Sequence, residues 1–253
     1  GEGIRLAEGR KATRVKATQA GVEVTVADEE GREETHSAER LLVAAGRQPN
    51  VADLGLESVG VEHGRAGIEV DKRLRTSNRK IFAIGDVAGG PQFTHVAGYH
   101  AGVVIKNALF RWPAKADHSA VPWVTYTEPE LAHVGLTEAQ AREKAGEIRV
   151  LRWPFAENDR AACERETEGL VKAITDKRGR ILGCSILGAH AGELILPWVL
   201  AVSGKEKVGR LAQAIVPYPT LSEAGKRAAG SYYTPGLFSE RTRKIVRFLA
   251  RFG

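Results

Sequence analysis

Alternating apolar and polar residues predict short strands in the first forty positions. Residues 21–26 place an apolar side chain at every second position, and the acidic turn at 28–31 leads into a polar second arm over 32–39. The apolar run at 41–45 then predicts a buried strand, which ends where glycine and proline appear at 46–50. This part of the chain is therefore expected to be a meander that feeds a buried strand.

A second buried strand and a helix are predicted in the middle of the chain. Residues 80–84 are mostly apolar and end in Gly85-Asp86, and apolar positions recur at helical spacing from 93 to 111. Trp112-Pro113 ends that helix, because the residue before proline is pushed away from helical backbone angles. The stretch 114–120 that follows predicts a domain boundary.

The rest of the chain predicts an independent α+β unit. Its turn at 176–179 indicates an antiparallel hairpin, and Thr137 stands at the N-cap position of a helix. Strands are expected at 121–125, 148–153, 170–175 and 181–187, and helices at 137–145, 190–202, 205–213, 222–229 and 240–252.

Composition excludes several classes of protein. Of 253 residues, 43% are hydrophobic and 27% are charged, and this apolar content excludes a disordered chain. The sequence has no periodic repeat, which excludes a collagen-like or coiled-coil fibre. No apolar run approaches the roughly 18 residues of a membrane-spanning helix. The net charge of +6 permits an anionic partner, but no wide patch interleaves basic and aromatic residues, so no nucleic-acid partner is expected. Methionine is absent, and we expect the sequence to be a piece of a longer protein.

Cysteines and histidines predict no metal site. Cys163 and Cys184 lie too far apart in sequence for a metal knuckle or a close redox pair, and both are interpreted as small buried side chains. Two such cysteines favour a reducing, cytoplasmic location. His95 and His100 do not share the helical face that metal ligands need, and His118 lies in a polar segment and is expected to be solvated.

Asp86, directly after a glycine at the end of a predicted strand, is a candidate ligand-binding residue. In open α/β sheets ligands lie beyond the carboxyl ends of strands, where this carboxylate could accept hydrogen bonds from sugar or ribityl hydroxyls. Gly85 would let the backbone approach the ligand, and the next helix would direct its first amides at an electron-rich group. A turn aspartate that caps its own backbone is an equally weighted alternative.

Four segments occur in order and at compatible spacing: 41–50, 76–87, 121–138 and 217–223. They resemble, in turn, the Gly-Arg-x-Pro-Asn segment, the second flavin-binding motif, the entry to the dimerisation domain and the interface motif of the flavin-dependent pyridine nucleotide–disulfide oxidoreductases. Any one of these matches would be weak, but the ordered set is specific.

The resemblance implies a fold of the α/β and α+β classes. A partial, Rossmann-like FAD/NAD(P)-binding domain would be followed by an α+β dimerisation domain with an antiparallel sheet flanked by helices. Residues 1–40 would be the tail of the NAD(P)-binding domain, 41–118 the C-terminal half of the FAD-binding domain, and 119–253 the dimerisation domain.

The resemblance also implies a set of cofactor-binding residues. Asp86 would hold the ribityl chain of FAD, the backbone of 93–95 would lie near the pyrimidine edge of the flavin, and Arg47 would lie near the crevice shared by flavin and nicotinamide. The complete set is Gly46, Arg47, Gly85, Asp86, Phe93, Thr94 and His95.

Tyr218 and Glu223 are the implied catalytic residues. Glu223 matches a glutamate that orients a catalytic histidine in this family, and Tyr218 stands in the place of that histidine. A phenol, with a pKa of about 10, is a poor base at pH 7, although it can donate a hydrogen bond or contact a thiolate–metal adduct. The mercuric reductase branch resembles this chain in having tyrosine there, but this chain lacks the cysteine pair at that branch's end. A packed interface aromatic is the alternative for Tyr218.

We therefore expect the C-terminal part of a homodimeric oxidoreductase that passes hydride from NAD(P)H through FAD to a disulfide or thiol-bound metal. No Gly-x-Gly-x-x-Gly follows a predicted strand, and the family's active-site cysteines are missing, so this fragment alone is expected to be inactive. A non-catalytic dimerisation module is the alternative. A basic nucleic-acid binder is a third interpretation, which rests on net charge alone.

The basic C-terminal helix leaves two interpretations open. Ile245, Leu249 and Phe252 form one apolar stripe among many basic residues. The helix could anchor the protein to a membrane surface, or it could dock on protein with its stripe inward and its charges outward. The docked helix is favoured, so no membrane partner is expected.

Overall fold

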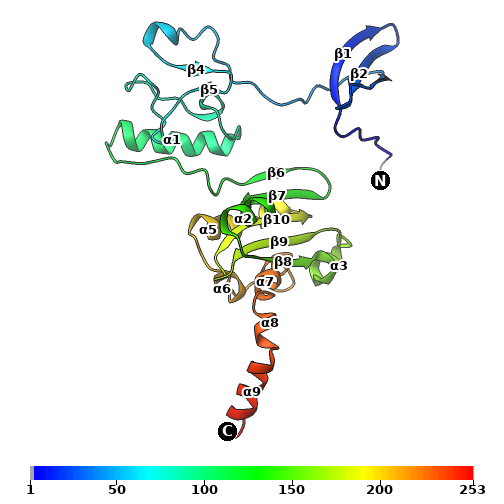
Figure 1. The fold of residues 1–253 in the computed structure, drawn as a ribbon, viewed down its shortest axis with the longest axis vertical. Coiled ribbons are helices and arrows are strands. Elements are labelled where there is room, and N and C mark those ends of the chain that lie inside the picture. Colours follow the sequence, from blue (N-terminus) through cyan, green and yellow to red (C-terminus); the bar gives the residue numbers. More distant parts are fainter. Residues whose placement is uncertain (1–2, 253) are drawn as a thin grey trace.

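The computed structural model describes residues 3–252. Figure 1 shows three bodies in series along the chain: a small N-terminal sheet, a middle unit that contains one long helix, and a larger unit built on a sheet. A final helix extends away from the last body and ends at the C-terminus. Among the described helices, none has both the length and the apolar content needed to cross a bilayer.

The N-terminal body is the predicted meander. Strands β1 (Lys11–Thr18), β2 (Gly21–Ala27) and β3 (Glu33–Ala38) form an antiparallel sheet in the order β1-β2-β3. Every residue of β1 is exposed, and Thr25 of β2 is the one residue in the three strands that is buried. This sheet therefore has almost no core of its own among the described residues.

The two buried strands predicted at 41–45 and 80–84 are not formed. Leu42 and Val43 are 88% and 76% exposed, and no strand within residues 3–252 pairs with them. The second run makes one isolated bridge, between Arg75 and Phe82. A strand forms only where a neighbour accepts its backbone hydrogen bonds along its length. The run 41–45 has no such neighbour within residues 3–252, and the run 80–84, although Ala83 is buried, has one over a single bridge.

The middle body packs short elements against a small core. Its elements are η1 (Glu57–Val59), β4 (His63–Gly64), β5 (Gly67–Ile68), η2 (Gly85–Ala88) and α1 (Thr94–Ala108). The predicted helix at 93–111 is confirmed as α1 and ends at Ala108, four residues before Trp112. The side chain of Asn107 donates a hydrogen bond to the Ala114 carbonyl and accepts one from the Ala114 N–H, which ties the following linker to the helix.

The third body is built on an antiparallel sheet in the order β6-β7-β10-β9-β8. Its strands are β6 (Trp123–Thr125), β7 (Glu130–Gly135), β8 (Ile148–Pro154), β9 (Leu170–Asp176) and β10 (Ile181–Gly188). The predicted hairpin is confirmed as β9 and β10, and β7 is a strand that the sequence pattern did not predict. The order places β6 and β8 at opposite edges of the sheet.

The third body also contains several helices, and most of them pack on this sheet. They are α2 (Glu138–Ala145), α3 (Asp159–Glu164) after η3 (Phe155–Glu157), α4 (Ala191–Leu194), α5 (Leu196–Ser203), α6 (Gly209–Ala212), α7 (Ser222–Gly230), α8 (Thr234–Leu237) and α9 (Glu240–Leu249). Trp198, Phe155 and Ile186 are among the largest apolar side chains buried in this core.

Two of the predicted helices differ from the observed ones. The helix expected at 190–202 is divided into α4 and α5, with Pro197 in the first turn of α5, because proline has no N–H with which to continue a helix from the preceding turn. The helix expected at 205–213 is formed only over Gly209–Ala212. The expected cap of α2 is confirmed, since Thr137 and Gln140 form a reciprocal capping box.

Candidate functional site

The loop that carries Asp86 packs closely on α1. Gly85 opens η2 with a left-handed φ of 67°, and a Cβ added there would lie 3.0 Å from the Cβ of Ala97. A side chain would therefore be strained by backbone angle and crowded by the helix. Glycine at this position lets Asp86 lie beside the first turns of α1.

Arg47 reaches the same loop from a segment far away in sequence. Its Nη1 lies 3.9 Å from Oδ2 of Asp86 and donates a hydrogen bond of 3.1 Å to the carbonyl of Gln92. The Arg47 and Asp86 side chains are 66% and 44% exposed, so this ion pair contributes little to stability. Both charged groups remain open to a ligand. Gly46, before them, is exposed and adopts a left-handed φ of 98°.

The N-terminus of α1 faces this polar group without a side-chain cap. Phe93 is the N-cap residue, and no side chain accepts a hydrogen bond from the first turn. The rings of Phe93 and His95 stack at 5.1 Å, and Nε2 of His95 is paired with the Pro122 carbonyl at 2.9 Å. The amides of Thr94 and its neighbours lie at the positive end of the helix dipole. The geometry brings Arg47 close to Asp86 and to Gln92, the residue before Phe93.

The side chain of His100, on α1, is hydrogen-bonded to the loop that carries Asp86. The sequence did not identify His100 as a site residue. Its Nδ1 accepts a hydrogen bond of 3.1 Å from the Gly85 N–H, so its Nε2 carries the proton and donates to Nε2 of His118 at 2.7 Å. His100 is 1% exposed, and burial, together with the charge of His118, lowers its pKa. His118 is exposed but is paired rather than simply solvated. The signal was present, because position 100 falls on the apolar face of the helix.

Tyr218 lies in a different part of the chain, next to an aspartate. Its hydroxyl donates a hydrogen bond of 2.9 Å to Oδ2 of Asp159 at the start of α3, and its side chain is 69% exposed. This hydrogen bond, together with the charges of Asp159 and Glu223, raises the pKa of Tyr218 above its usual value of 10. Tyr218 is therefore a protonated hydrogen-bond donor at neutral pH. Glu223, in the first turn of α7, is half-buried.

The two cysteines differ in burial, which corrects one expectation. Cys184 is fully buried in β10, as expected, and burial raises the pKa of its thiol. Cys163 is exposed on α3, four residues after Asp159. The helix α3 has six residues, and Ala161 is the one that it buries. A pattern of six residues is too short to show which side of the helix is buried, so the exposure of Cys163 could not be predicted. No group of His, Cys, Asp and Glu suited to a metal ion occurs in residues 3–252.

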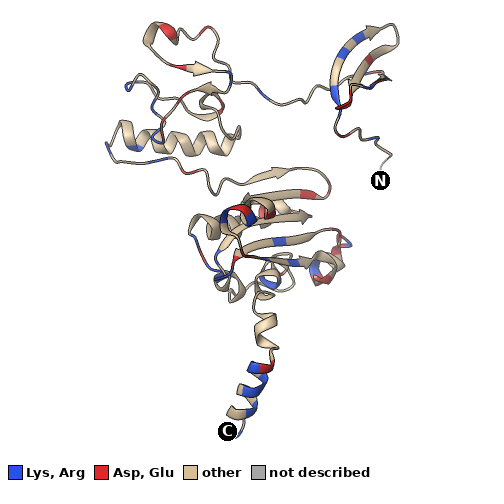
Figure 2. Ribbon diagram, viewed as in Figure 1, with Lys and Arg blue, Asp and Glu red and all other residues tan. Residues whose placement is uncertain are grey.

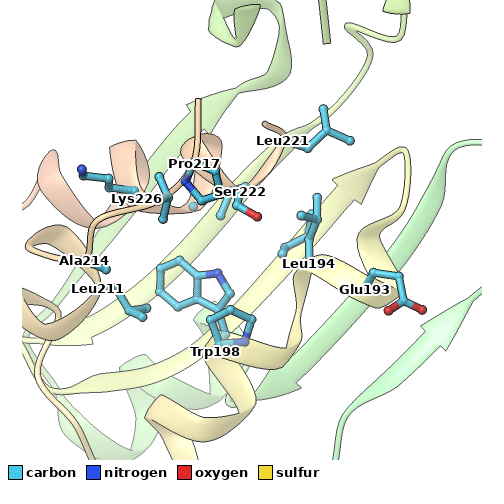
Figure 3. Close-up of a pocket in the computed structure, with 14 residues that line it drawn as sticks. Glu193, Leu194, Trp198, Leu211, Ala214, Pro217, Leu221, Ser222 and Lys226 are labelled. Atoms are coloured by element: carbon cyan, nitrogen blue, oxygen red, sulfur yellow. The ribbon is translucent and has the colours of Figure 1, made fainter. Parts of the chain in front are cut away.

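An apolar hollow lies beneath the segment that carries Tyr218 (Figure 3). Pro217 and Leu221, on either side of Tyr218, line a cavity of about 220 Å³ together with Trp198 of α5. Figure 3 shows Lys226 and Glu193 at opposite ends of this cavity. The 217–223 segment thus borders an apolar hollow that the Tyr218 side chain does not line.

The Arg47–Asp86 group and the Tyr218 group are not brought together within one chain. Arg47, Asp86 and the start of α1 belong to the middle body, which leads into the sheet at its β6 edge. The helix α7 packs on β8 and β9, toward the other edge of that sheet (Figure 1). A site that used both groups would need the second group from another chain.

Comparison with protein families matches both parts of this architecture. Residues 121–229 match the model described as "Pyridine nucleotide-disulphide oxidoreductase, dimerisation domain". Residues 1–101 match the model described as "Pyridine nucleotide-disulphide oxidoreductase". The sequence is 42% identical to dihydrolipoyl dehydrogenase of Bacillus subtilis over 211 residues, which are 83% of this chain and 44% of that protein. It is 38% identical to mercuric reductase of Bacillus cereus over 229 residues, 90% of this chain and 36% of that protein.

Solved structures give the same result. LpdA of Mycobacterium tuberculosis superimposes with a TM-score of 0.82 at 31% identity, over 91% of this chain and 50% of that one. The HOCl-induced flavoprotein disulfide reductase of Escherichia coli gives a TM-score of 0.78 at 32% identity, over 87% and 50% of the two chains. The chain spans about half the length, or less, of the relatives it matches. On these matches and this fold, the chain belongs to the pyridine nucleotide–disulfide oxidoreductase family.

Proposed function

We propose that this chain contributes the dimerisation domain and part of the flavin site to an FAD- and NAD(P)H-dependent oxidoreductase that acts on a sulfur group. The observation that carries this proposal is the convergence of Arg47, Asp86 and the uncapped N-terminus of α1 in a chain of this family. Its relatives include dihydrolipoyl dehydrogenase and mercuric reductase, so the sulfur group is a disulfide or a thiolate-bound metal ion.

The residues of the middle body fit FAD. The exposed Asp86 carboxylate is an acceptor suited to ribityl hydroxyls, and Gly85 removes the side chain that would crowd the loop against α1. The first amides of α1, at Thr94 and His95, are donors suited to the electron-rich pyrimidine edge of the flavin. Bound FAD would supply two-electron transfer from NAD(P)H to the sulfur centre.

Arg47 and His100 would hold the loops of that flavin site in place. Arg47 binds the Gln92 carbonyl and faces Asp86, so it links the loop at 46–50 to the loop that precedes α1. His100 accepts the Gly85 N–H and holds the turn on which Asp86 stands. The neutral form of His100 is required for this contact, and its lowered pKa keeps it neutral at pH 7.

Tyr218 and Glu223 would act across a homodimer at the sulfur centre of the partner subunit. The raised pKa of Tyr218 makes it a donor of a hydrogen bond rather than a base, so its role would be to stabilise a thiolate or its metal adduct. Apolar side chains exposed in the same body support a subunit contact there, since Ile215 is 99% exposed and Leu200 is 64% exposed.

The remaining parts of the proposal concern domains and location. Residues 1–40 would belong to the NAD(P)-binding domain, 41–118 to the FAD-binding domain and 119–253 to the dimerisation domain. This division is supported by two bodies joined through the irregular segment 39–56 and by the linker that follows α1.

A cytoplasmic location is supported by the two unpaired cysteines, Cys163 and Cys184.

The test is flavin binding by the protein that contains this chain. The purified protein should show the visible absorption of bound flavin, and Asp86→Ala should weaken flavin affinity by roughly tenfold to a hundredfold, as expected for losing hydrogen bonds to a charged group. Glu69→Ala removes an exposed carboxylate of the same body and should leave flavin affinity unchanged. A protein without flavin absorption, or equal effects of the two substitutions, would contradict the proposal.

A non-catalytic dimerisation module is the second candidate. It is favoured by the absence of both a dinucleotide fingerprint and a spaced cysteine pair from the 253 residues. The two candidates differ in flavin binding, because a module would dimerise without flavin. Light scattering that finds a monomer at micromolar concentration would argue against the module as well.

A further inference from the structure

The C-terminal helix contributes no buried residue to the core of the chain among residues 3–252. No residue of α9 is buried, and Figure 1 shows the helix extending away from the third body. Phe248 and Leu249 are 56% and 58% exposed, and Phe252 is 74% exposed. The docked helix favoured by the sequence is therefore not observed within residues 3–252.

The helix is held in its fold by its own N-terminal residues. Ser239 is the N-cap, and its side chain accepts a hydrogen bond from the Thr242 N–H. The Thr242 hydroxyl in turn donates to the Gly236 carbonyl at 2.8 Å, which links α9 to α8. The segment is thus capped locally, and it forms an amphipathic helix whose residues are exposed except for the half-buried Thr242.

Its two faces differ sharply in chemistry. Arg243, Arg247 and Arg251 recur at four-residue steps and share one face with Lys244. Ile245, Phe248 and Leu249 lie on the opposite side, where Arg241 also falls, and Phe252 follows just beyond the end of α9. Five basic residues between 240 and 252 stand against one acidic residue, Glu240, and Figure 2 shows the basic positions distributed along the helix.

The apolar surface continues past the start of the helix. Leu237 and Phe238, at the end of α8, are 63% and 65% exposed. Aromatic and aliphatic side chains on one face, with arginine and lysine on the other, are the pattern of helices that lie in the membrane interface plane. A helix of ten residues is far too short to span a bilayer, and it is long enough to lie flat on one.

We propose that the segment 237–252 binds the surface of membranes rich in anionic phospholipid. The apolar face enters the boundary between headgroups and acyl chains, and the basic face pairs with lipid phosphates. Charge selects this partner over a second copy of the same helix, because two segments that each carry five basic residues and one acidic residue repel each other, whereas anionic phospholipid attracts them. This inference does not depend on the proposed oxidoreductase activity.

The experiment is co-sedimentation of the whole chain with vesicles of stated composition. One set contains phosphatidylcholine with about one-third phosphatidylglycerol, and the other contains phosphatidylcholine alone. We expect binding to the anionic vesicles, weak binding to the neutral ones, and loss of binding as salt rises from about 0.1 M to about 0.5 M. Absence of binding to anionic vesicles, or equal binding to both sets, overturns the proposal.

Two variants separate the contributions of the two faces. Replacing Arg243, Lys244, Arg247 and Arg251 with Gln should weaken binding to anionic vesicles by on the order of a hundredfold or more. The double variant Phe248→Ser, Leu249→Ser should abolish binding while leaving the charge unchanged. Both changes lie on exposed residues outside the core, so circular dichroism of the chain should show an intact fold.

A matched control removes the same charge elsewhere. Replacing Lys11, Arg14, Lys16 and Arg65 with Gln takes four exposed basic residues from the N-terminal and middle bodies and should leave vesicle binding within about twofold. If this control loses as much binding as the α9 variant, attraction is a property of overall charge and the proposal is wrong. It is also wrong if the Phe248→Ser, Leu249→Ser variant turns a dimer into a monomer without changing vesicle binding.

Discussion

At the scale of single residues, glycine and histidine position the loop that carries Asp86. Gly85 adopts a backbone angle that other residues rarely adopt, and its N–H is held by the buried ring of His100. Neither residue presents a charged group to a ligand. Each instead fixes the backbone from which Asp86 projects, so the acceptor is placed before any ligand arrives.

Two glycines of this region should respond to alanine in opposite directions. Gly85→Ala should destabilise the chain by about 1–2 kcal/mol, because φ is left-handed and the new Cβ would meet the Cβ of Ala97 at 3.0 Å. Gly98→Ala, on the exposed side of α1 with nothing within 4 Å, should stabilise it by about 0.5–1 kcal/mol. Urea unfolding of both variants measures the difference. Equal effects would show that the loop does not depend on glycine at position 85.

The phenol of Tyr218 should titrate above the usual range because of Asp159. A raised pKa means that Tyr218 keeps its proton to higher pH, and Asp159→Asn should lower that pKa toward about 10 by removing the charge that opposes a phenolate. Alkaline titration of tyrosinate absorbance reports this change. The difference spectrum against Tyr218→Phe isolates this residue among five tyrosines. An unchanged midpoint in Asp159→Asn would show that the two side chains are not paired in solution.

At the scale of elements, α2 is joined to the sheet through one carboxylate. Oε2 of Glu138 lies 2.7 Å from Nζ of Lys172 on β9 and 3.5 Å from Nη2 of Arg152 on β8, and its Oε1 lies 2.8 Å from Nη2 of Arg142 on its own helix. Hydrogen bonds from Lys172 and Arg142 lower the pKa of Glu138 to about 2. This one side chain connects a helix to two strands.

The contribution of Glu138 to stability should therefore depend on pH. Its pKa is about 2 in the folded chain and 4.5 for the unperturbed group, so its stabilisation is complete above pH 4.5 and is lost as pH falls toward 2. Glu138→Gln should destabilise the chain at pH 7, and the difference from the unchanged chain should shrink steadily below pH 4.5. Thermal unfolding across this range tests it. A difference that does not vary with pH would indicate that shape, and not charge, matters at this position.

Elements whose partners are close in sequence could be predicted, and elements whose partners are distant could not. The hairpin of β9 and β10 and the capped start of α2 each depend on residues a few positions apart, and both are observed. The apolar run 41–45 has the composition of a buried strand, but a strand also needs a neighbour that its own sequence does not specify. The proximity of Arg47 to Asp86 was expected from family resemblance. The helical pattern placed His100 on the apolar face, but its hydrogen bonds to Gly85 and His118 are tertiary contacts that a local pattern cannot predict.

At the scale of the whole molecule, the exposed apolar surface of the third body indicates where a second chain would sit. Ile215 is almost fully exposed directly before the 217–223 segment, and Leu196 and Leu200 of α5 are 58% and 64% exposed. The Arg47–Asp86 group and the Tyr218 group lie in separate bodies of one chain. A homodimer would cover the exposed apolar surface of the third body. It could also bring the Arg47–Asp86 group of one chain close to the Tyr218 group of the other.

Ile215→Asp should therefore weaken the dimer. Burying an isoleucine at a subunit contact stabilises it by roughly 1.5–3 kcal/mol, and an aspartate there would also have to lose water, so the dissociation constant should rise by at least about tenfold. Light scattering over a range of concentrations measures the change. Val15→Asp, on the exposed strand β1, introduces the same charge and should leave the dimer intact. A dimer that survives Ile215→Asp but dissociates when α9 is shortened would place the subunit contact at the C-terminal helix, contradicting both this prediction and the membrane role assigned to that helix.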